Sequence, residues 1–234
     1  MENYITLKIA DGTEMRAYVS RPSVPGKYPG IIVYQEAFGV NAHIRDVAGR
    51  FAREGYVAVA PELYHRTGAG IEGDYKDFSS LQPHFSALKE DLVGQDVRAV
   101  YDWLINDSSV DAERAACVGF CLGGRIAFQT NTMLPVKAAI SFYGGGIAET
   151  LVNRIPQLHG ASLMFWGGRD KRILPEHIRT IIDGFRAANK PYTNIEFSEA
   201  EHGFFCDARP TYHKESAQQA WTVLLHFLRT HVGN

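Results

Sequence analysis

The sequence predicts an α/β protein with a mostly parallel central sheet, an antiparallel hairpin at its N-terminus and helices on both faces of the sheet. Short apolar runs alternate with helix-length amphipathic segments along most of the chain, a pattern typical of parallel strands joined by helical crossovers. The runs are apolar throughout, as expected for strands buried on both faces. Only the first two segments show the alternation of a half-exposed hairpin.

The elements can be placed in chain order. Residues 5–9 and 15–19 alternate around the turn Asp11-Gly12 and predict the hairpin. Buried strands are expected at 30–34, 56–60 and 115–119, further strands at 136–142, 162–166 and 194–197, and helices at 42–54, 88–104, 122–130, 176–188 and 214–229. A polar, glycine-rich stretch from 64 to about 80 is long enough to be a functional loop. Ligands of such sheets bind at the carboxyl ends of the strands, so the loops there should carry the chemistry.

Composition limits the class of protein. The chain has 234 residues, 45% of them hydrophobic, with 24 basic and 26 acidic residues, which suits one globular domain over 1–234. There is no basic stripe, so nucleic acid is not expected as a partner. The longest run without Asp, Glu, Lys or Arg, residues 155–168, is too short to span a membrane. With no signal peptide pattern and three cysteines, we expect a reduced, cytoplasmic protein.

One motif points to a nucleophile. The segment Gly119-Phe-Cys121-Leu-Gly123-Gly124 joins a predicted buried strand directly to a helix, which is the G-x-nucleophile-x-G turn with sulfur in place of the serine oxygen. The N-terminus of the helix favours a thiolate, and the backbone N–H of Leu122 would point at an oxyanion. A buried structural cysteine is the alternative, and Cys117 in mid-strand fits that description better. A Walker loop would need Lys after the glycines, where Arg125 stands.

An acid and a base follow in the order that this turn requires. Asp170 ends an apolar strand through two glycines, and His202 follows the last strand. We expect Asp170 to orient the imidazole of His202, which would exchange protons with Cys121. Each residue alone is a weak signal, because single aspartates and histidines are common in loops. Three candidates at three strand ends, in the order that this fold requires, together form a strong signal for a catalytic triad.

The loop after the first buried strand, Gln35-Glu-Ala-Phe-Gly-Val-Asn41, should supply a second oxyanion N–H, and Ala37 is the candidate. Glu36 in this loop is either functional or an exposed carboxylate. Aromatic residues at predicted strand ends could line an apolar acyl pocket, although core packing explains them equally well: Phe38, Tyr64, Tyr143 and Phe204.

Together, the loop from Gln35 to Asn41, the cysteine turn, Gly168-Arg-Asp170 and His202-Gly-Phe204 resemble the dienelactone hydrolase family of the α/β-hydrolase superfamily. The resemblance covers about residues 25–230 and implies a catalytic triad of Cys121, His202 and Asp170. It also implies that Glu36 interacts with the thiol. A nearby carboxylate would keep Cys121 protonated until substrate displaces it, which would protect the sulfur from oxidation.

The sequence departs from this family where substrate specificity is concerned. Dienelactone-specific members hold the substrate carboxylate with two arginines, one of them four residues after the histidine, where this chain has Cys206. An unpaired carboxylate in a dry pocket is costly. The protein is therefore expected to prefer neutral esters, thioesters or lactones, unless Arg66, Arg169 or Arg209 replaces the missing partners. Cys206 is either a small apolar pocket residue or a redox partner of Cys121.

These inferences predict a thiol-dependent hydrolase of carboxylic esters or lactones that acts through an acyl-thioester without metal or cofactor. Its expected partner is a small-molecule ester or lactone, with no membrane or nucleic acid, and its expected state is a monomer or small homo-oligomer. An acyltransferase or peptidase on the same triad remains an alternative. A non-catalytic ligand-binding protein is a second one, since the fold alone would allow it.

Overall fold

A computed structural model describes residues 3–233. The chain divides into two compact units, the N-terminal unit up to Ala116 and the C-terminal unit from Cys117 to Gly233, which are described in turn. Eight strands follow the sheet order β1-β2-β4-β3-β5-β6-β7-β8, and β5 (Val110–Phe120) belongs to both units. The strands and helices confirm the predicted α/β class, with its mostly parallel sheet and N-terminal antiparallel hairpin.

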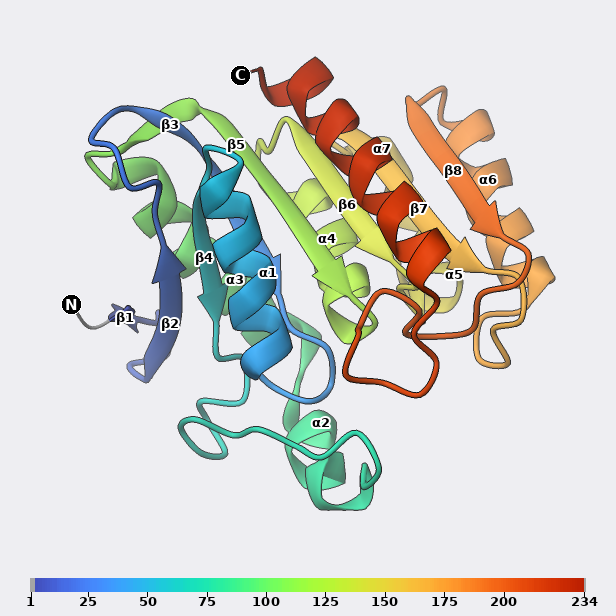
Figure 1. Ribbon diagram of the computed structural model, residues 1–234, viewed down its shortest axis with the longest axis horizontal. Coiled ribbons are helices and arrows are strands. Elements are labelled where there is room, and N and C mark those ends of the chain that lie inside the picture. Colours follow the sequence, from blue (N-terminus) through green and yellow to red (C-terminus); the bar gives the residue numbers. More distant parts are fainter. Residues whose placement is uncertain (1–2, 234) are drawn as a thin grey trace. The chain divides into compact units, whose positions relative to one another are not determined.

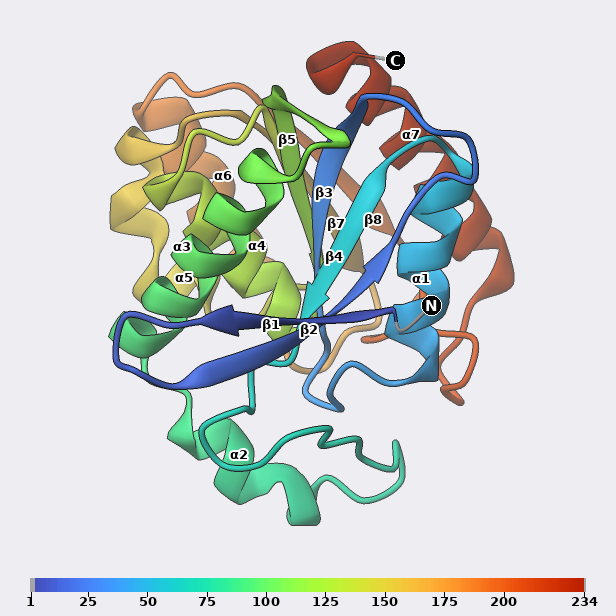
Figure 2. The ribbon, with the colours of Figure 1, turned by 90° about the vertical axis from the view of Figure 1, so that its left-hand side faces the viewer.

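In the N-terminal unit, β1 (Tyr4–Lys8) and β2 (Glu14–Ser20) form the predicted hairpin. The strand β2 also pairs antiparallel with β4 (Val57–Pro61), which lies parallel to β3 (Tyr28–Tyr34). Helices α1 (Ala42–Arg53) and α3 (Glu90–Asn106) cover opposite faces of β3 and β4 (Figure 2). Since both faces are covered, all five residues of β4 are buried, as its unbroken apolar sequence predicts.

The chain between β4 and α3 is the least regular part of this unit. It holds a short 3-10 turn, η1 (Ser79–Leu81), and a six-residue helix, α2 (Gln82–Ala87). Figure 2 shows α2 and its flanking loops standing apart from the strands. The sequence predicts a functional loop over most of this stretch but not its helix. Pro83 near the start of α2 favours helix initiation, while the segment is too short for amphipathic periodicity to reveal it.

In the C-terminal unit, β6 (Ala138–Phe142), β7 (Ala161–Gly167) and β8 (Tyr192–Phe197) are parallel neighbours. Helix α7 (Lys214–Val232) lies on one face of these strands, and α4 (Leu122–Met133) and α6 (Pro175–Ala187) lie on the other (Figure 1). Two short helices, α5 (Ile147–Thr150) and η2 (Val152–Gln157), connect β6 to β7. This arrangement places the chain after each parallel strand at one edge of the unit.

Most predicted elements appear within a few residues of their expected bounds. The main differences are α2, α5 and η2, which are too short to show a period, and β5, which starts at Val110 rather than at 115. The early part of β5 contains Asp111, Glu113 and Arg114 and is partly exposed, so its sequence lacks the apolar signature of a buried strand. Across residues 3–233, no helix is long and apolar enough to cross a lipid bilayer.

Candidate active site

The turn between β5 and α4 has the backbone geometry that its sequence predicts. Cys121 has φ 54° and ψ −113°, a conformation that side chains other than glycine rarely adopt and that costs about 1–3 kcal/mol. The turn is fixed by hydrogen bonds: the N–H of Cys121 donates to the carbonyl of Phe142 at 3.0 Å, and the N–H of Gly124 donates to the carbonyl of Cys121 at 3.0 Å. The half-buried Cys121 thus sits at the apex of a strained turn, directly before a helix.

The glycines of this turn are required by close backbone approach. A Cβ atom on Gly119 would lie 1.9 Å from the carbonyl oxygen of Gly123, and one on Gly124 would lie 2.7 Å from the carbonyl oxygen of Phe142. Because both neighbours are main-chain atoms, neither could move aside for a side chain. Leu122 is the first residue of α4, so its N–H has no acceptor within the helix and suits the oxyanion role predicted for it.

His202 and Asp170 form a buried pair in the same unit. Nδ1 of His202 lies 2.7 Å from Oδ2 of Asp170, and its N–H must donate because a carboxylate only accepts. The other carboxylate oxygen, Oδ1, accepts from the backbone N–H groups of Arg172 at 2.8 Å and Ile173 at 3.2 Å. Asp170 is therefore held on both oxygens, and it fixes the orientation of the imidazole with Nε2 as the reactive nitrogen.

The electrostatics of this pair involve the cysteine. Burial opposes protonation of His202, but the neighbouring Cys121 sulfur and the Asp170 carboxylate outweigh it and raise the pKa of the imidazole to about 9. Burial likewise opposes ionisation of Asp170, but the hydrogen bonds from His202 and from two backbone N–H groups lower the pKa of that carboxyl below its ordinary value. The three groups thus favour a charged imidazolium beside an ionised Asp170.

Nε2 of His202 is buried and forms no hydrogen bond of ordinary geometry with the residues that the structure describes, although the Cys121 sulfur is close enough to influence its pKa. Contacts of this kind are often long before substrate binds.

The other two cysteines differ from Cys121. Cys117 is fully buried, which raises the pKa of its thiol, and its Sγ contacts the carbonyl of Ala127 at 3.5 Å. Cys206 is also buried, and no disulfide joins any of these three cysteines.

The predicted loop residues Glu36 and Ala37 lie in the N-terminal unit, directly after β3. Both are buried, Glu36 completely, so the expectation that Glu36 is an exposed carboxylate is excluded. The loop is held by its neighbours: Gln35 accepts from the N–H of Leu63 at 3.1 Å, and the hydroxyl of Tyr64 donates to the carbonyl of Ala37 at 2.9 Å. Tyr64 therefore supports the candidate oxyanion residue through its backbone.

The remaining aromatic candidates are packed into their units. Tyr143 and Phe204 are completely buried, and the ring of Tyr143 lies 5.1 Å from that of His202 and 5.3 Å from that of Phe204. Tyr143 has φ 39°, so the residue after β6 is strained, as Cys121 is. These contacts show core packing around His202, and a substrate contact stays a prediction for Tyr143, Phe204, Tyr64 and Phe38.

Two of the three arginines that could replace the family's carboxylate-binding pair are engaged elsewhere. Arg66 binds Asp96 through both terminal nitrogens at 2.8 Å and binds Asp11 through Nε at 2.6 Å. Arg169 is paired with Glu199 on the surface. The guanidinium of Arg209 lies so close to Gly203 that a Cβ atom there would be 2.3 Å from its Nη1. Only Arg209 is thus adjacent in space to the residue after His202.

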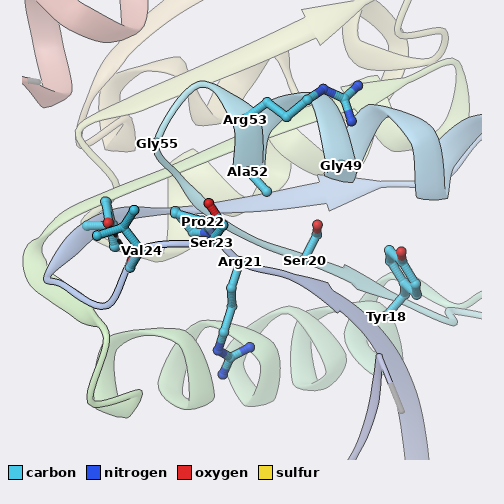
Figure 3. Close-up of a pocket in the computed structure, with 11 residues that line it drawn as sticks. Tyr18, Ser20, Arg21, Pro22, Ser23, Val24, Gly49, Ala52, Arg53 and Gly55 are labelled. Atoms are coloured by element: carbon cyan, nitrogen blue, oxygen red, sulfur yellow. Dashed lines mark hydrogen bonds between the residues drawn. The ribbon is translucent and has the colours of Figure 1, made fainter. Parts of the chain in front are cut away.

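A separate cavity of about 640 Å³ lies in the N-terminal unit, between residues 18–28 and the C-terminal half of α1 (Figure 3). Its lining contains no cysteine, histidine or carboxylate. It therefore lacks a nucleophile–base pair, and it is not the candidate active site.

Sequence reasoning missed three half-buried aromatic residues in the loop after β4: Tyr75, Phe78 and Phe85. The rings of Tyr75 and Phe78 lie 4.6 Å and 6.3 Å from that of Phe38. Aromatic residues within an otherwise polar, glycine-rich stretch were the available signal. That signal did not show which residues the loop would contact.

Comparison with known proteins agrees with this geometry. A sequence profile of the dienelactone hydrolase family matches residues 15–232. A Yersinia pestis protein named "Putative carboxymethylenebutenolidase" is 38% identical over 234 residues, with 95% of this chain and 86% of that protein covered. An Escherichia coli K12 protein of the same name is 36% identical, with 96% and 85% covered.

Solved structures give the same result. A crystal structure titled "Putative Dienelactone Hydrolase" from Klebsiella pneumoniae subsp. pneumoniae MGH 78578 is 35% identical with a TM-score of 0.86, covering 96% of this chain and 97% of that one. A dienelactone hydrolase-like promiscuous phosphotriesterase from metagenomic libraries, at 23% identity and a TM-score of 0.84 over 98% of both chains, shares the fold.

The sheet, its helices and the strained cysteine turn define an α/β-hydrolase. The family profile and the relatives above 30% identity make the assignment more specific. The chain belongs to the dienelactone hydrolase family, and it is a hydrolase of the ester and lactone class.

Proposed function

We propose that this hydrolase uses Cys121 as its nucleophile, His202 as its general base and acid, and Asp170 as the group that orients His202. The observation that carries the proposal is the position of Cys121. It sits in a left-handed backbone conformation at the strand–helix turn and close enough to His202 to raise the pKa of the imidazole. A cysteine in the core needs neither the backbone strain nor a buried histidine–aspartate pair beside it.

The reaction follows from these roles. His202 takes the proton of the Cys121 thiol, and the sulfur attacks the carbonyl carbon. A C–S bond forms as the electron pair of the C=O π bond moves to oxygen, and this oxyanion accepts hydrogen bonds from the N–H groups of Leu122 and Ala37. Imidazolium His202 protonates the leaving alcohol oxygen as the C–O bond breaks, which leaves an acyl-thioester. His202 then removes a proton from water, whose oxygen attacks the thioester, and the C–S bond breaks to return the carboxylic acid and the cysteine.

Glu36 belongs to the proposal as the group that interacts with the resting thiol. Its complete burial in the loop after β3 is consistent with a specific role rather than with a solvated surface position. If Glu36 helps to generate the thiolate when substrate arrives, Glu36→Ala lowers the acylation rate far more than it changes substrate binding. Glu36→Gln, which keeps the shape and removes the charge, is the matched control for burial.

The test of the nucleophile is a Cys121→Ala substitution with the Cys117→Ala variant as its control. Mass spectrometry of the acid-quenched wild-type enzyme during turnover of an ester is expected to show the mass of one acyl group, absent in Cys121→Ala and retained in Cys117→Ala. Hydrolysis should fall by about 10³-fold or more in Cys121→Ala. A Cys121→Ala variant with wild-type activity would contradict the proposal.

The alternatives give different results in the same assays. An acyltransferase or peptidase would form the same acyl-enzyme but pass the acyl group to an amine or alcohol faster than to water. A ligand-binding protein would show no burst of product and no acylated mass.

The charge preference of the substrate site is tested by comparing hydrolysis of a dienelactone free acid with that of its methyl ester. Because Arg66 and Arg169 are paired with carboxylates of the protein, we expect faster hydrolysis of the ester.

The remaining expectations are part of this proposal. We infer a cytoplasmic enzyme that acts as a single domain without metal or cofactor, on small-molecule substrates and without nucleic acid or membrane partners. Size-exclusion chromatography with light scattering distinguishes a monomer from a small homo-oligomer. Retained activity after dialysis against a chelator tests the metal expectation.

A further inference from the structure

The loop between β4 and α3 brings a cluster of aromatic side chains to the residue beside Ala37. The ring of Tyr75 lies 4.6 Å from that of Phe38, the ring of Phe78 lies 6.3 Å from it, and the ring of Phe85 lies 5.6 Å from that of Phe78. Phe38 is buried, whereas the other three rings keep part of their surface exposed. Three half-buried aromatic rings gathered around Phe38 leave apolar surface that a ligand could cover.

Specific contacts hold this loop against the segment that contains Phe38. The hydroxyl of Tyr75 accepts from Nδ2 of Asn41 at 2.8 Å, and the N–H of Gly73 donates to the carbonyl of Phe38 at 3.1 Å. Gly39 has φ 82°, and a Cβ atom there would lie 1.9 Å from the carbonyl oxygen of Ile71. The loop is therefore docked on residues 38–41 through main-chain and side-chain contacts and not merely adjacent to them.

A second set of contacts fixes the two sides of the loop. Near its start, Arg66 forms a bidentate pair with Asp96 of α3 and also binds Asp11 of the hairpin. Farther along, Glu72 pairs with Arg45 of α1. Bidentate arginine pairs hold their partners in a defined geometry. The aromatic rings are thus presented from an anchored segment, which lowers the entropic cost of arranging them around a ligand.

The charges of the segment disfavour an anionic ligand. Residues 71–85 contain three carboxylates, Glu72, Asp74 and Asp77, against a single cation, Lys76. Arg66 is the only arginine between β4 and α3, and both of its edges are occupied by Asp96 and Asp11. A substrate carboxylate near these rings would meet mainly like charge, and Arg66 is already paired, so a neutral group is favoured there.

We propose that residues 71–85 are the specificity element of this hydrolase, and that they select esters or lactones whose acyl side carries an uncharged aromatic ring. The inference rests on the proposed function, in which the N–H of Ala37 holds the carbonyl oxygen. That role brings the substituent of the carbonyl to Phe38 and to the rings docked on it. A planar ring there gains edge-to-face or offset contacts that a saturated ring lacks.

The test compares three ethyl esters that differ only in the group at one end: 3-phenylpropanoate, 3-cyclohexylpropanoate and the monoester of succinate, with ethyl acetate as the small reference. The wild type is expected to prefer the phenyl over the cyclohexyl ester by about 5-fold in kcat/KM, and over the charged ester by about 10-fold or more. Because each preference is a ratio measured on one preparation, it does not depend on the fraction of folded protein.

Three variants make the test specific. Phe78→Leu keeps apolar volume but removes the ring, so the phenyl preference is expected to fall to about 1-fold. Phe78→Tyr keeps the ring and should keep the preference. Trp103→Leu removes a half-buried aromatic residue of α3 whose ring packs against Arg21, and it should leave the ratio unchanged.

An unchanged phenyl preference in Phe78→Leu, or a wild type that prefers the charged ester, overturns the inference. Failure of the proposed function looks different, because it appears with ethyl acetate: Cys121→Ala would then hydrolyse this ester as well as the wild type does. A wild type that hydrolyses none of the esters overturns both.

Discussion

The N-terminal and C-terminal units each contain a buried histidine that is hydrogen-bonded to a buried aspartate. In the C-terminal unit, Nδ1 of His202 lies 2.7 Å from Asp170. In the N-terminal unit, Nε2 of His65 lies 3.1 Å from Asp96. The second nitrogen of each ring is buried and forms no hydrogen bond with the described residues. By burial and by partner type, the two pairs are nearly equivalent.

They differ in what surrounds them. Asp96 also receives a bidentate pair from Arg66, so its charge is already balanced by a guanidinium that never loses its proton. Within residues 3–233, the charged partner recorded for Asp170 is His202, with two backbone N–H groups on its other oxygen, and Cys121 is near the imidazole. A histidine–aspartate pair therefore indicates catalysis only when the histidine supplies the charge balance and a nucleophile lies beside it.

The largest expected effect is a difference in hydrolytic activity between variants of the two histidines. His202→Ala should lower kcat/KM by about 10³-fold or more, because the general base is lost, whereas His65→Ala should change kcat/KM by less than about 3-fold. Steady-state hydrolysis of ethyl acetate measures both, with folded protein quantified by circular dichroism. A comparable loss in the two variants would show that the two histidines do not differ in their contribution to catalysis.

For the two aspartates, we expect the larger loss of stability in the N-terminal pair, at Asp96, and the larger loss of activity in the C-terminal pair, at Asp170. Asp96→Asn leaves the guanidinium of Arg66 without its buried counter-charge, so the free energy of unfolding should fall by about 3 kcal/mol or more. Asp170→Asn should lower kcat by about 10²-fold or more through loss of the oriented imidazole, with a smaller effect on stability. Urea unfolding curves and kcat for the two variants provide the comparison, and equal destabilisation would show that Arg66 is not what distinguishes the pairs.

The pH dependence of stability should follow His202. Its pKa is raised from an ordinary value near 6.5 to about 9, so the folded state holds a proton that the unfolded state releases at lower pH. The resulting stabilisation is fully present below about pH 6.5 and is lost as the pH rises toward about 9. Urea unfolding measured across this interval tests the slope.

The same measurement on Cys121→Ala is the control for the cause. Without the sulfur, the NMR titration midpoint of His202 should move below that of the wild type, so the loss of stability should still begin near pH 6.5 but end at lower pH and be smaller in total. A midpoint that does not move would show that Cys121 does not contribute to the charge state of His202.

The smallest expected effect concerns the geometry of the non-catalytic pair. Arg66→Lys keeps the positive charge beside Asp96 but removes the bidentate fork, so the free energy of unfolding should fall by about 1 kcal/mol. The kcat/KM ratio for neutral over charged esters should not change, because Arg66 is already occupied. A shift of that ratio toward charged esters would instead implicate Arg66 in substrate binding.

The sequence could identify one of these pairs and not the other for a physical reason. Cys121 and Asp170 each follow a buried strand end, and His202 follows the half-exposed β8. The strands and the glycines beside these residues are local patterns. His65 lies in a loop, and the sequence around it contains no comparable pattern. Its partner, Asp96, lies in the middle of α3, where an aspartate between apolar residues gives no sign that it is buried against a loop some 30 positions earlier.

The sequence by itself determined the α/β class, the hairpin, most strands and helices, and the three candidate residues of the triad. Each of these depends on short-range periodicity or on the tight turn that glycines permit. The tertiary structure alone decided that Arg66 is occupied by Asp96 and Asp11, that Glu36 is buried, and that Tyr75, Phe78 and Phe85 gather at Phe38. These contacts join residues far apart in the chain, and their energy depends on distance and burial, which no local pattern encodes.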